Sequence, residues 1–307
     1  MALGNYGHIS SWNTSPVLDM SGLFANKNNF NDDISSWNTV NVMDMADMFN
    51  GASIFNQNIT TDGSGWNVEK VTTMNNMFKN ANIFNGNITN WNVSKVSYMV
   101  GMFEGAGAFD QPISTTNTYW DVTEVMNMTG MFKGASIFNQ NIANWTVEKV
   151  SNMSDMFNGA STFNQDISSW GISTSVADMS GMFKNAIAFD QNITDWVPKF
   201  NVFTNDMIPN MFEGATAMHS KFNNYLGWGA SPLSYFFSFN PIPIPQSDIK
   251  SEVISLINGN STKYGPVSNW DTSLITDMSG LFADKQSFNY DISNWDTSNV
   301  TDMSGMF

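Results

Sequence analysis

The side chains best suited to proton transfer at neutral pH are the two histidines of the chain, His8 and His219. Catalysis by either histidine would need a serine, a cysteine or a carboxylate in a recognisable motif beside it. No such motif surrounds them, and the chain contains no cysteine. An internal copy of the segment around His8 has Pro266 at the matching position, so the fold does not require an imidazole there. The sequence therefore predicts no catalytic residue and a protein that is not an enzyme.

Oxygen ligands for a hard cation are the second chemistry to consider, because an aspartate recurs at the start of the string DMSG and its variants. These aspartates would stack along one side of a repeat array: Asp19, Asp44, Asp178, Asp277 and Asp302. Other repeats have Thr73, Tyr98 or Asn127 there, and no loop has the dense acidic spacing of a calcium site. We therefore expect a solvated edge or a charge at a helix N-terminus, with no metal ion and no cofactor.

Asparagines in N-x-S/T sequons are the candidate modification sites. They are Asn13, Asn58, Asn87, Asn92, Asn127, Asn144, Asn152, Asn192, Asn260 and Asn299. Their number is close to chance for a chain so rich in asparagine, and N-glycosylation requires an exported protein. Glycosylation of some of them is a hypothesis that the sequence leaves open.

The charge balance excludes two classes of partner. The formal net charge is −15, and every basic residue is a lysine. Such a chain is poorly suited to phosphate contacts, to base readout or to anionic membrane surfaces. We expect no nucleic-acid partner and no membrane span, since no apolar stretch is long enough. The N-terminal "MALGNYGHISSW" has no signal-peptide pattern, so the export signal of a secreted form would lie outside these residues.

The elements that position these residues belong to an internal repeat, marked by tryptophans at a basic spacing of 25 residues. They are Trp12, Trp37, Trp66, Trp91, Trp120, Trp145, Trp170, Trp196, Trp270 and Trp295. Two repeats are longer by four residues, in "TTDGSGW" and "STTNTYW". Because a unit of this length cannot bury its own apolar residues, the expected fold is a stack of units, a solenoid.

Each unit predicts a short helix, a tight turn, a strand and a bend that carries the tryptophan. Met45, Met48, Phe49 and Ala52 have the i, i+3, i+4, i+7 spacing of one helix face. Two residues after the helix phenylalanine stands Asn, Gly or Asp, which predicts a left-handed residue that ends the helix. The next segment, "IFNQNI" or "TFNQDI", has the length and flanks of a strand. The sequence thus predicts an α/β repeat solenoid of about ten units with a parallel strand ladder.

The repeated apolar residues have two interpretations. Stripes of Met, Phe and Trp that recur in every unit are typical of a core. A row of partly exposed tryptophans at the bend would instead suit sugar or partner binding. The Asn and Gln of "FNQ" are expected to form stacked amide ladders with a structural role.

Three strings, "FNQDISSW", "WDTSNVTDMSGMF" and "MFNGASIFNQNI", resemble the 25-residue tandem repeats of BspA-like, leucine-rich-repeat-related bacterial surface proteins. The resemblance covers most of the chain except about residues 198–258. It implies a right-handed, leucine-rich-repeat-like coil and exposure at the cell surface. It implies no catalytic residues.

A longer period divides the chain into three parts. Residues 4–49 align without a gap on residues 262–307, and more than half of the aligned positions are identical. We therefore predict a repeat solenoid over 1–218, an irregular Pro-rich segment with a capping helix over 219–261, and the start of a second array over 262–307. "SPLSYFFSFNPIPIPQ" is expected to drape over the end of the first array. "SDIKSEVISLING" predicts a helix that caps the second array, with Ser247 or Asp248 at its N-cap and Gly259 at its C-cap.

The first unit has no capping helix of its own sequence, and the last stops before its strand. We therefore expect a non-enzymatic extracellular or cell-surface protein with a structural or adhesive role. Either the chain is a window of a longer tandem array, or copies join head to tail into a filament. The alternative is a carbohydrate- or protein-binding module that uses one face of the solenoid. The expected partners are copies of the chain, further tandem domains, glycans or proteins of a host or neighbouring surface.

Overall fold

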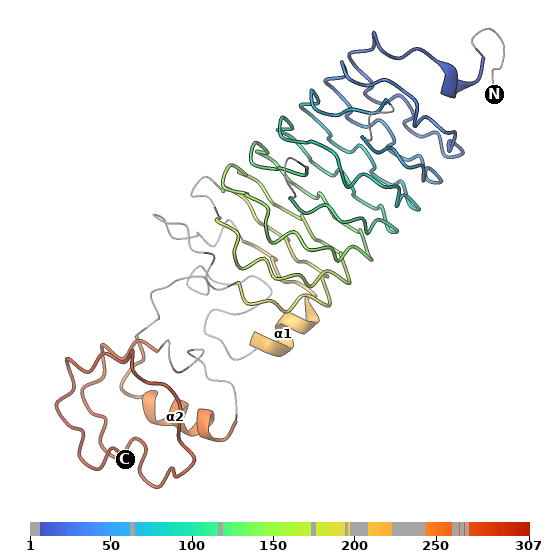
Figure 1. The fold of residues 1–307 in the computed structure, drawn as a ribbon. Coiled ribbons are helices and arrows are strands. Elements are labelled where there is room, and N and C mark those ends of the chain that lie inside the picture. The colour runs from blue at the N-terminus through green and yellow to red at the C-terminus, as the bar shows by residue number, and fades with distance from the viewer. Residues whose placement is uncertain are drawn as a thin grey trace.

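The computed structural model describes residues 7–61, 65–115, 119–172, 176–193, 196, 208–222, 243–259, 264, 267 and 270–307. Two bodies are visible in Figure 1, each with its own hydrophobic cluster. We call residues 7–222 the coil stack and residues 243–307 the C-terminal unit. In the coil stack, successive turns of chain, here called coils, lie one on the next.

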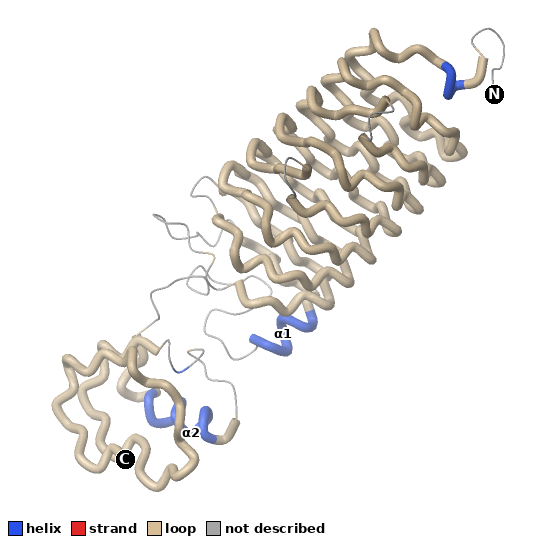
Figure 2. Tube along the Cα trace, viewed as in Figure 1, coloured by secondary structure: helices blue, strands red, loops and turns tan. Residues whose placement is uncertain are grey.

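Helices and strands are scarce in the described residues. The helices are the 3₁₀-helix η1 (Ile9–Ser11), α1 (Thr216–Phe222) and α2 (Ile249–Ile257). All other described residues are loops, turns and isolated bridges, and Figure 2 shows them as tan tube. The predicted α/β solenoid with a parallel strand ladder is therefore wrong.

Left-handed residues explain why the predicted helix does not form in each unit. Asp47 has a φ of +58° and Gly51 a φ of +74°. Residues in this conformation interrupt a right-handed helix. Some N–H groups donate to a carbonyl of the next coil, as Phe49 does to Met77 O (2.8 Å). Others donate to a carbonyl three residues earlier in the same coil, as Ala52 does to Phe49 O (2.9 Å). Each predicted helix is a run of tight turns that is hydrogen-bonded to its neighbouring coil.

The left-handed position predicted after the helix phenylalanine is confirmed. Positive φ occurs at Asn26, Gly51, Asn80, Gly105, Gly134, Gly159, Asn185, Gly214 and Asp284. A second left-handed column, two residues before the same phenylalanine, was not predicted. It comprises Gly22, Asp47, Asn76, Gly101, Gly130, Asp155, Gly181, Asn210, Gly280 and Gly305. Only Gly, Asn and Asp occupy it, and that restriction was the signal in the sequence.

Asparagine side chains replace the predicted strand ladder. In each "FNQ"-like segment of the coil stack, the N–H of the Asn or Asp donates to the side-chain Oδ1 of its counterpart one coil earlier. The six bonds join Asn56 to Asn31, Asn85 to Asn56, Asp110 to Asn85, Asn139 to Asp110, Asn164 to Asn139 and Asp190 to Asn164, at 2.7–3.0 Å. The predicted amide ladder is confirmed. It takes over the role of a backbone ladder, and the segments are not strands.

This ladder makes a first prediction about Asn85, an exposed residue whose Oδ1 accepts from Asp110 N–H (3.0 Å) and from Gln111 Nε2 (3.1 Å). Asn85→Ala is expected to lower the free energy of unfolding by about 1 kcal/mol, since Asp110 N–H loses its acceptor and Gln111 Nε2 keeps only the Asn85 carbonyl (3.0 Å). Asn85→Asp keeps an acceptor oxygen, as Asp110 does one coil later, and is expected to have a smaller effect. Urea denaturation of both variants measures the difference. An Asn85→Asp variant as unstable as Asn85→Ala would contradict the ladder's role.

The core of the coil stack consists of the repeated Trp, Phe, Met and Ile residues. The tryptophans from Trp37 to Trp196 are at most 3% exposed. Each also donates from Nε1 to an isoleucine carbonyl of the preceding coil, as Trp91 does to Ile59 O at 2.7 Å. The core interpretation of these stripes is confirmed, and a row of exposed tryptophans is excluded for this segment.

The two described α-helices, α1 and α2, each cover an end of a stack of coils. After the last described coil of the stack, α1 buries Met218, and Lys221 Nζ donates to Asp190 O at 2.6 Å. The predicted capping helix is confirmed as α2, which starts after Asp248 and is followed by the left-handed Gly259. Val253 of α2 is buried in the cluster of the C-terminal unit. Most of the segment predicted to drape over the array lies outside the described residues.

Candidate functional site

The backbone hydrogen bonds between coils give the structure a direction. In the column of tight turns, the N–H groups of one coil donate to carbonyls of the coil that follows. Examples are Gly22 to Ala46 O (2.8 Å) and Phe24 to Met48 O (2.8 Å). A coil that begins such a stack therefore offers unused carbonyls, and a coil that ends it offers unused N–H groups.

Two faces of the described chain have these unused groups. The first coil offers the carbonyls of Ser21, Leu23 and Ala25, which accept no hydrogen bond within the described residues. The coil of residues 302–307 offers the N–H groups of Met303, Gly305 and Phe307, and none of these donates within that same part of the chain. The two faces are therefore complementary, with acceptors on one and donors on the other.

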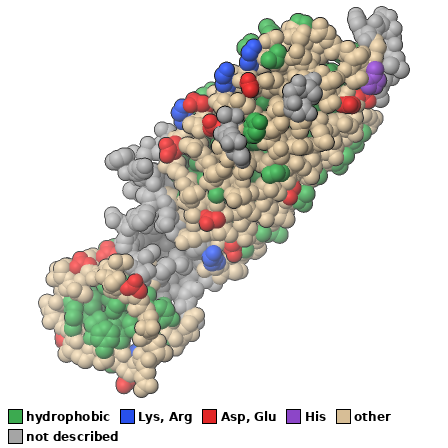
Figure 3. Space-filling model, viewed as in Figure 1, with side chains coloured by type: hydrophobic (Ala, Val, Ile, Leu, Met, Phe, Trp, Pro, Cys, Tyr) green, Lys and Arg blue, Asp and Glu red, His purple; other side chains and the backbone are tan. Residues whose placement is uncertain are grey.

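The face of residues 288–307 is also apolar. Phe307 is 78% exposed, whereas Phe49, its counterpart in the aligned copy, is 0% exposed because the next coil covers it. Phe288, Ile292, Val300 and Met306 are only partly buried in the same cluster. In Figure 3, hydrophobic side chains gather on this part of the C-terminal unit. Its residue types are those of a buried coil-to-coil contact.

The face of the first coil shows the same contrast with its copy. Trp12 is 41% exposed and Leu23 is 44% exposed, but the matching Trp270 and Leu281 are 2% and 4% exposed. The difference arises because α2 and the adjoining Ile244 pack in one cluster with Trp270 and Leu281. α1 thus covers the end of the first array and α2 covers the start of the second, whereas Trp12 and Leu23 have no such cover among the described residues.

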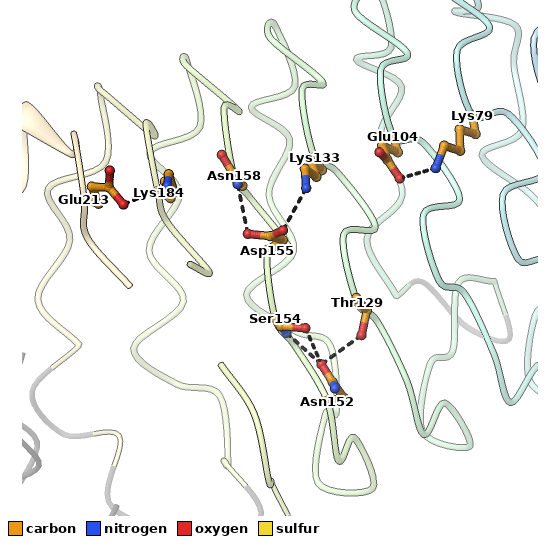
Figure 4. Close-up of polar contacts among 10 residues, drawn as sticks. All are labelled: Lys79, Glu104, Thr129, Lys133, Asn152, Ser154, Asp155, Asn158, Lys184 and Glu213. Atoms are coloured by element: carbon orange, nitrogen blue, oxygen red, sulfur yellow. Dashed lines mark hydrogen bonds and ion pairs between the residues drawn. The ribbon is translucent and has the colours of Figure 1, made fainter. Parts of the chain in front are cut away.

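Polar contacts on the flank hold neighbouring coils in register (Figure 4). Lys79 pairs with Glu104 at 2.8 Å, and Lys184 pairs with Glu213 at 2.7 Å. Lys133 pairs with Asp155 at 2.7 Å, and this hydrogen bond raises the pKa of Lys133. Such exposed pairs contribute little stability individually. Their regular spacing along one edge instead gives a lateral surface of mixed charge.

The predicted aspartate column is present as parallel bridges that connect neighbouring coils. These bridges run through Asp19, Asp44, Thr73, Tyr98, Asn127, Asn152 and Asp178, with a separate bridge from Asp277 to Asp302. The carboxylates turn back on their own backbone: Asp19 Oδ1 accepts from Ser21 N–H at 2.7 Å. Hydrogen bonds from the hydroxyl and the backbone N–H of Ser21 lower the pKa of Asp19. Among the described residues, no three acidic or histidine side chains are grouped as metal ligands.

Five sequon asparagines lie in the same type of turn, Asn13, Asn87, Asn92, Asn127 and Asn152. Asn92 Oδ1 accepts from Ser94 N–H (3.2 Å) and Ser94 Oγ (2.7 Å), just as Asp166 accepts from Ser168. Asn87, Asn127 and Asn152 are half-buried in such turns; Asn13, Asn58, Asn144, Asn192 and Asn299 are exposed; Asn260 lies outside the described residues. Turn chemistry therefore explains N-x-S/T strings without glycosylation, which stays a prediction.

One sequon has a further structural role. Asn144 Nδ2 donates to Thr115 O at 2.5 Å, and its Oδ1 accepts from Thr115 N–H at 3.1 Å. A glycan on this nitrogen would crowd the hydrogen bond to Thr115 O, because the linkage leaves the amide only one N–H.

The two histidines are far apart in the fold and each contacts its own backbone region. His8 Nδ1 accepts from Ser10 N–H at the start of η1 (3.3 Å). His219 Nε2 lies 3.0 Å from Phe212 O and belongs to α1. Both positions are explained by helix geometry and local hydrogen bonding.

A comparison with models of known protein families supports the tandem repetition seen in the sequence. The family described as "Mycoplasma protein of unknown function, DUF285" matches residues 2–116, 115–225 and 252–307. The chain belongs to this family. The three tandem DUF285 matches support a repeat protein and do not extend to the likeness with BspA-like, leucine-rich-repeat-related proteins. A search of curated proteins found no match. No helix of the described part of this DUF285 protein is long and apolar enough to cross a membrane.

Proposed function

We propose that the chain is a non-enzymatic structural protein of the cell surface or extracellular space whose copies join head to tail. In this contact, the face of residues 288–307 of one copy packs on the first coil of the next copy. The observation that carries the proposal is the exposure of apolar side chains that the aligned copy buries: Trp12 and Leu23 are 41% and 44% exposed, against 2% and 4% for Trp270 and Leu281. The residue types at this face are those that the fold buries elsewhere.

The polarity of the hydrogen bonds supports this contact over a symmetric one. In the register of the stack, the donors at Met303, Gly305 and Phe307 would meet the carbonyls of Asp19, Ser21 and Leu23, as Phe49 N–H meets Met77 O. The carbonyl of Asp19, like those of Ser21 and Leu23, accepts no hydrogen bond within the described residues. Phe307 would then stack on Phe24, as Phe49 stacks on Phe78 at 5.4 Å. A contact between two different faces does not close on itself, so it produces an open filament.

The adhesive part of the proposal rests on the lateral surface. A filament of such copies repeats the same polar edges many times, and repetition strengthens weak contacts with a neighbouring surface. The formal net charge of −15 opposes association between copies at low ionic strength. Assembly is therefore expected to increase as salt is added.

Two substitutions on opposite faces test the assembly. Phe307→Asp disables the face of residues 288–307, and Leu23→Asp disables the first coil, because each places a charge in an apolar contact. Wild-type chain is expected to form filaments in electron micrographs, and each variant alone is expected to stay monomeric by light scattering. Ile137→Asp, at a side chain that is 47% exposed on another coil, is the matched control and should assemble as wild type does.

Mixing the two variants gives the sharpest outcome. Each retains one intact face, so a mixture of Phe307→Asp and Leu23→Asp should form dimers and nothing longer. A wild-type chain that stays monomeric at about 1 mM, or a mixture that forms no dimer, would overturn the proposal.

A further inference from the structure

A polar groove crosses four coils beside the two longer repeats. Its volume is about 570 Å³, within the range of small-molecule sites, and it is partly open to solvent. The side chains that define it are Asn38, Asn67, Asn90, Asn92, Glu69 and Tyr119. Tyr119 belongs to one four-residue extension, "STTNTYW", and Thr61, from the other, also contributes to the wall.

The turns fix the direction in which the asparagine amides point. Asn67 Oδ1 accepts from Glu69 N–H at 2.8 Å, and Asn38 Oδ1 accepts from Val40 N–H at 3.1 Å. Asn92 Oδ1 accepts from Ser94 N–H at 3.2 Å. A backbone N–H can donate only to the oxygen of an amide, so the orientation of each side chain is set. The Nδ2 groups consequently face away from these turns.

These amide nitrogens lack acceptors. Within the described residues, the Nδ2 groups of Asn38, Asn67 and Asn92 donate no hydrogen bond. Asn90 is similar, because its Oδ1 accepts from Thr61 N–H at 2.9 Å while its Nδ2 makes no bond in the same part of the chain. Four donors from three consecutive coils, each oriented by a hydrogen bond to its own oxygen, are suited to a ligand with several acceptor oxygens.

The remaining side chains of the groove wall indicate the charge and polarity of the ligand. Glu69 supplies an acceptor for hydroxyl groups and would repel an anion. No lysine is among the described side chains of the wall, which disfavours phosphate, sulfate and carboxylate ligands. Tyr119, 37% exposed, offers a ring face on which a ligand with C–H groups can pack.

We propose that this groove binds a neutral carbohydrate. Hydroxyl groups both donate and accept, so one ligand can satisfy the asparagine amides and Glu69 together. The apolar face of a sugar ring would lie on Tyr119. An apolar peptide or a lipid fits less well, because most described groups of the wall are polar.

The chain itself supplies substitutions that its fold accepts. In the column of Asn38, Asn67 and Asn92, the next coil has Asp121, whose Oδ1 makes the same turn with Thr123 N–H at 3.0 Å. Asn67→Asp and Asn92→Asp therefore keep the turn and remove the donor. Asn13→Asp makes the same change in the first coil, outside the groove, and is the matched control. Tyr119→Ser introduces the residue that other coils have at the same position, namely Ser36 and Ser169.

The test measures binding of cellotriose, chitotriose and maltotriose to the full chain by ligand-observed NMR and calorimetry. At least one is expected to bind with a Kd of about 0.1–1 mM. The double variant Asn67→Asp/Asn92→Asp and the Tyr119→Ser variant should weaken it about tenfold, and Asn13→Asp should not. Unchanged circular dichroism and denaturation midpoints would show that these variants are folded.

Three outcomes would overturn the proposal. The first is no binding of any of the three trisaccharides by the folded wild-type chain. The second is binding that Asn13→Asp weakens as much as the groove variants do. The third is capture of an unstructured peptide, with no sugar binding, by the same groove. Loss of sugar binding in a chain that still forms filaments would leave the assembly proposal intact, so the two proposals fail separately.

Discussion

Replacing Trp91 by alanine is expected to lower the free energy of unfolding of the coil stack by about 3–5 kcal/mol. Trp91 is fully buried, and its ring lies between Trp66 at 6.3 Å and Trp120 at 6.4 Å. The substitution leaves a cavity, and it leaves Ile59 O without the Nε1–H that now donates to it at 2.7 Å. The measurement is urea denaturation of the full chain, monitored by circular dichroism at a concentration where it is monomeric.

Two further variants separate the effect of the cavity from the effect of the lost hydrogen bond on the free energy of unfolding. Trp91→Phe keeps most of the ring contacts and removes the Nε1–H donor, so it is expected to lower the free energy by about 1–3 kcal/mol. Ile83→Ala, at a side chain that is 48% exposed on a neighbouring turn, is expected to change it by less than about 0.5 kcal/mol. If Trp91→Ala were no more destabilising than Ile83→Ala, the tryptophan column would not be the core of the stack.

The sequence pattern predicted correctly which residues of the helix-like segment are buried, but it predicted the wrong backbone conformation for them. Met45, Met48, Phe49 and Ala52 are all 0% exposed, as the helical spacing predicted. The same spacing arises here from consecutive tight turns, because each turn advances the chain by about as many residues as a helical turn does. Only the left-handed residue inside the run, Asp47 in this unit, distinguishes the two backbones.

The strand prediction failed for a different reason. Phe55 and Ile59 face the core with the spacing that was predicted. The N–H between them, at Asn56, donates to the side chain of Asn31 instead of a carbonyl. A short segment with an Asn or Asp at the same position of each repeat can pair through side chains or through backbone. Periodicity gives no information on which of these occurs.

The two proposed sites differ in how far the sequence anticipated them. The exposed faces can be located from the alignment of 262–307 on 4–49, because the alignment pairs each exposed apolar residue with a counterpart that the fold buries. The groove depends on how the two longer repeats pack on their neighbours, as when Thr61 N–H donates to Asn90 Oδ1. Those partners are 29 residues apart, and the pairing depends on coil stacking that no local pattern specifies.

A second large effect is expected in the C-terminal unit, where Val253→Asp should unfold residues 270–307 and leave the coil stack folded. Val253 lies in α2, is fully buried and shares one cluster with Trp270, Met278 and Leu281. A carboxylate at this position would be buried without a partner, which costs several kcal/mol. A body of this size buries little apolar surface, so its stability margin is small. The stack has a separate cluster, which is why it should be unaffected.

Hydrogen exchange read by mass spectrometry distinguishes the two bodies in one experiment. In Val253→Asp, amides of residues 270–307 are expected to lose protection, and amides such as that of Phe103, bonded to Met131 O at 2.8 Å, should keep it. Ile254→Asp is the matched control, because its side chain is on the same helix but 49% exposed, and it should exchange as wild type does. Protection that falls in both bodies would show that they fold as one unit. Unchanged protection in residues 270–307 would show that α2 does not hold the second array.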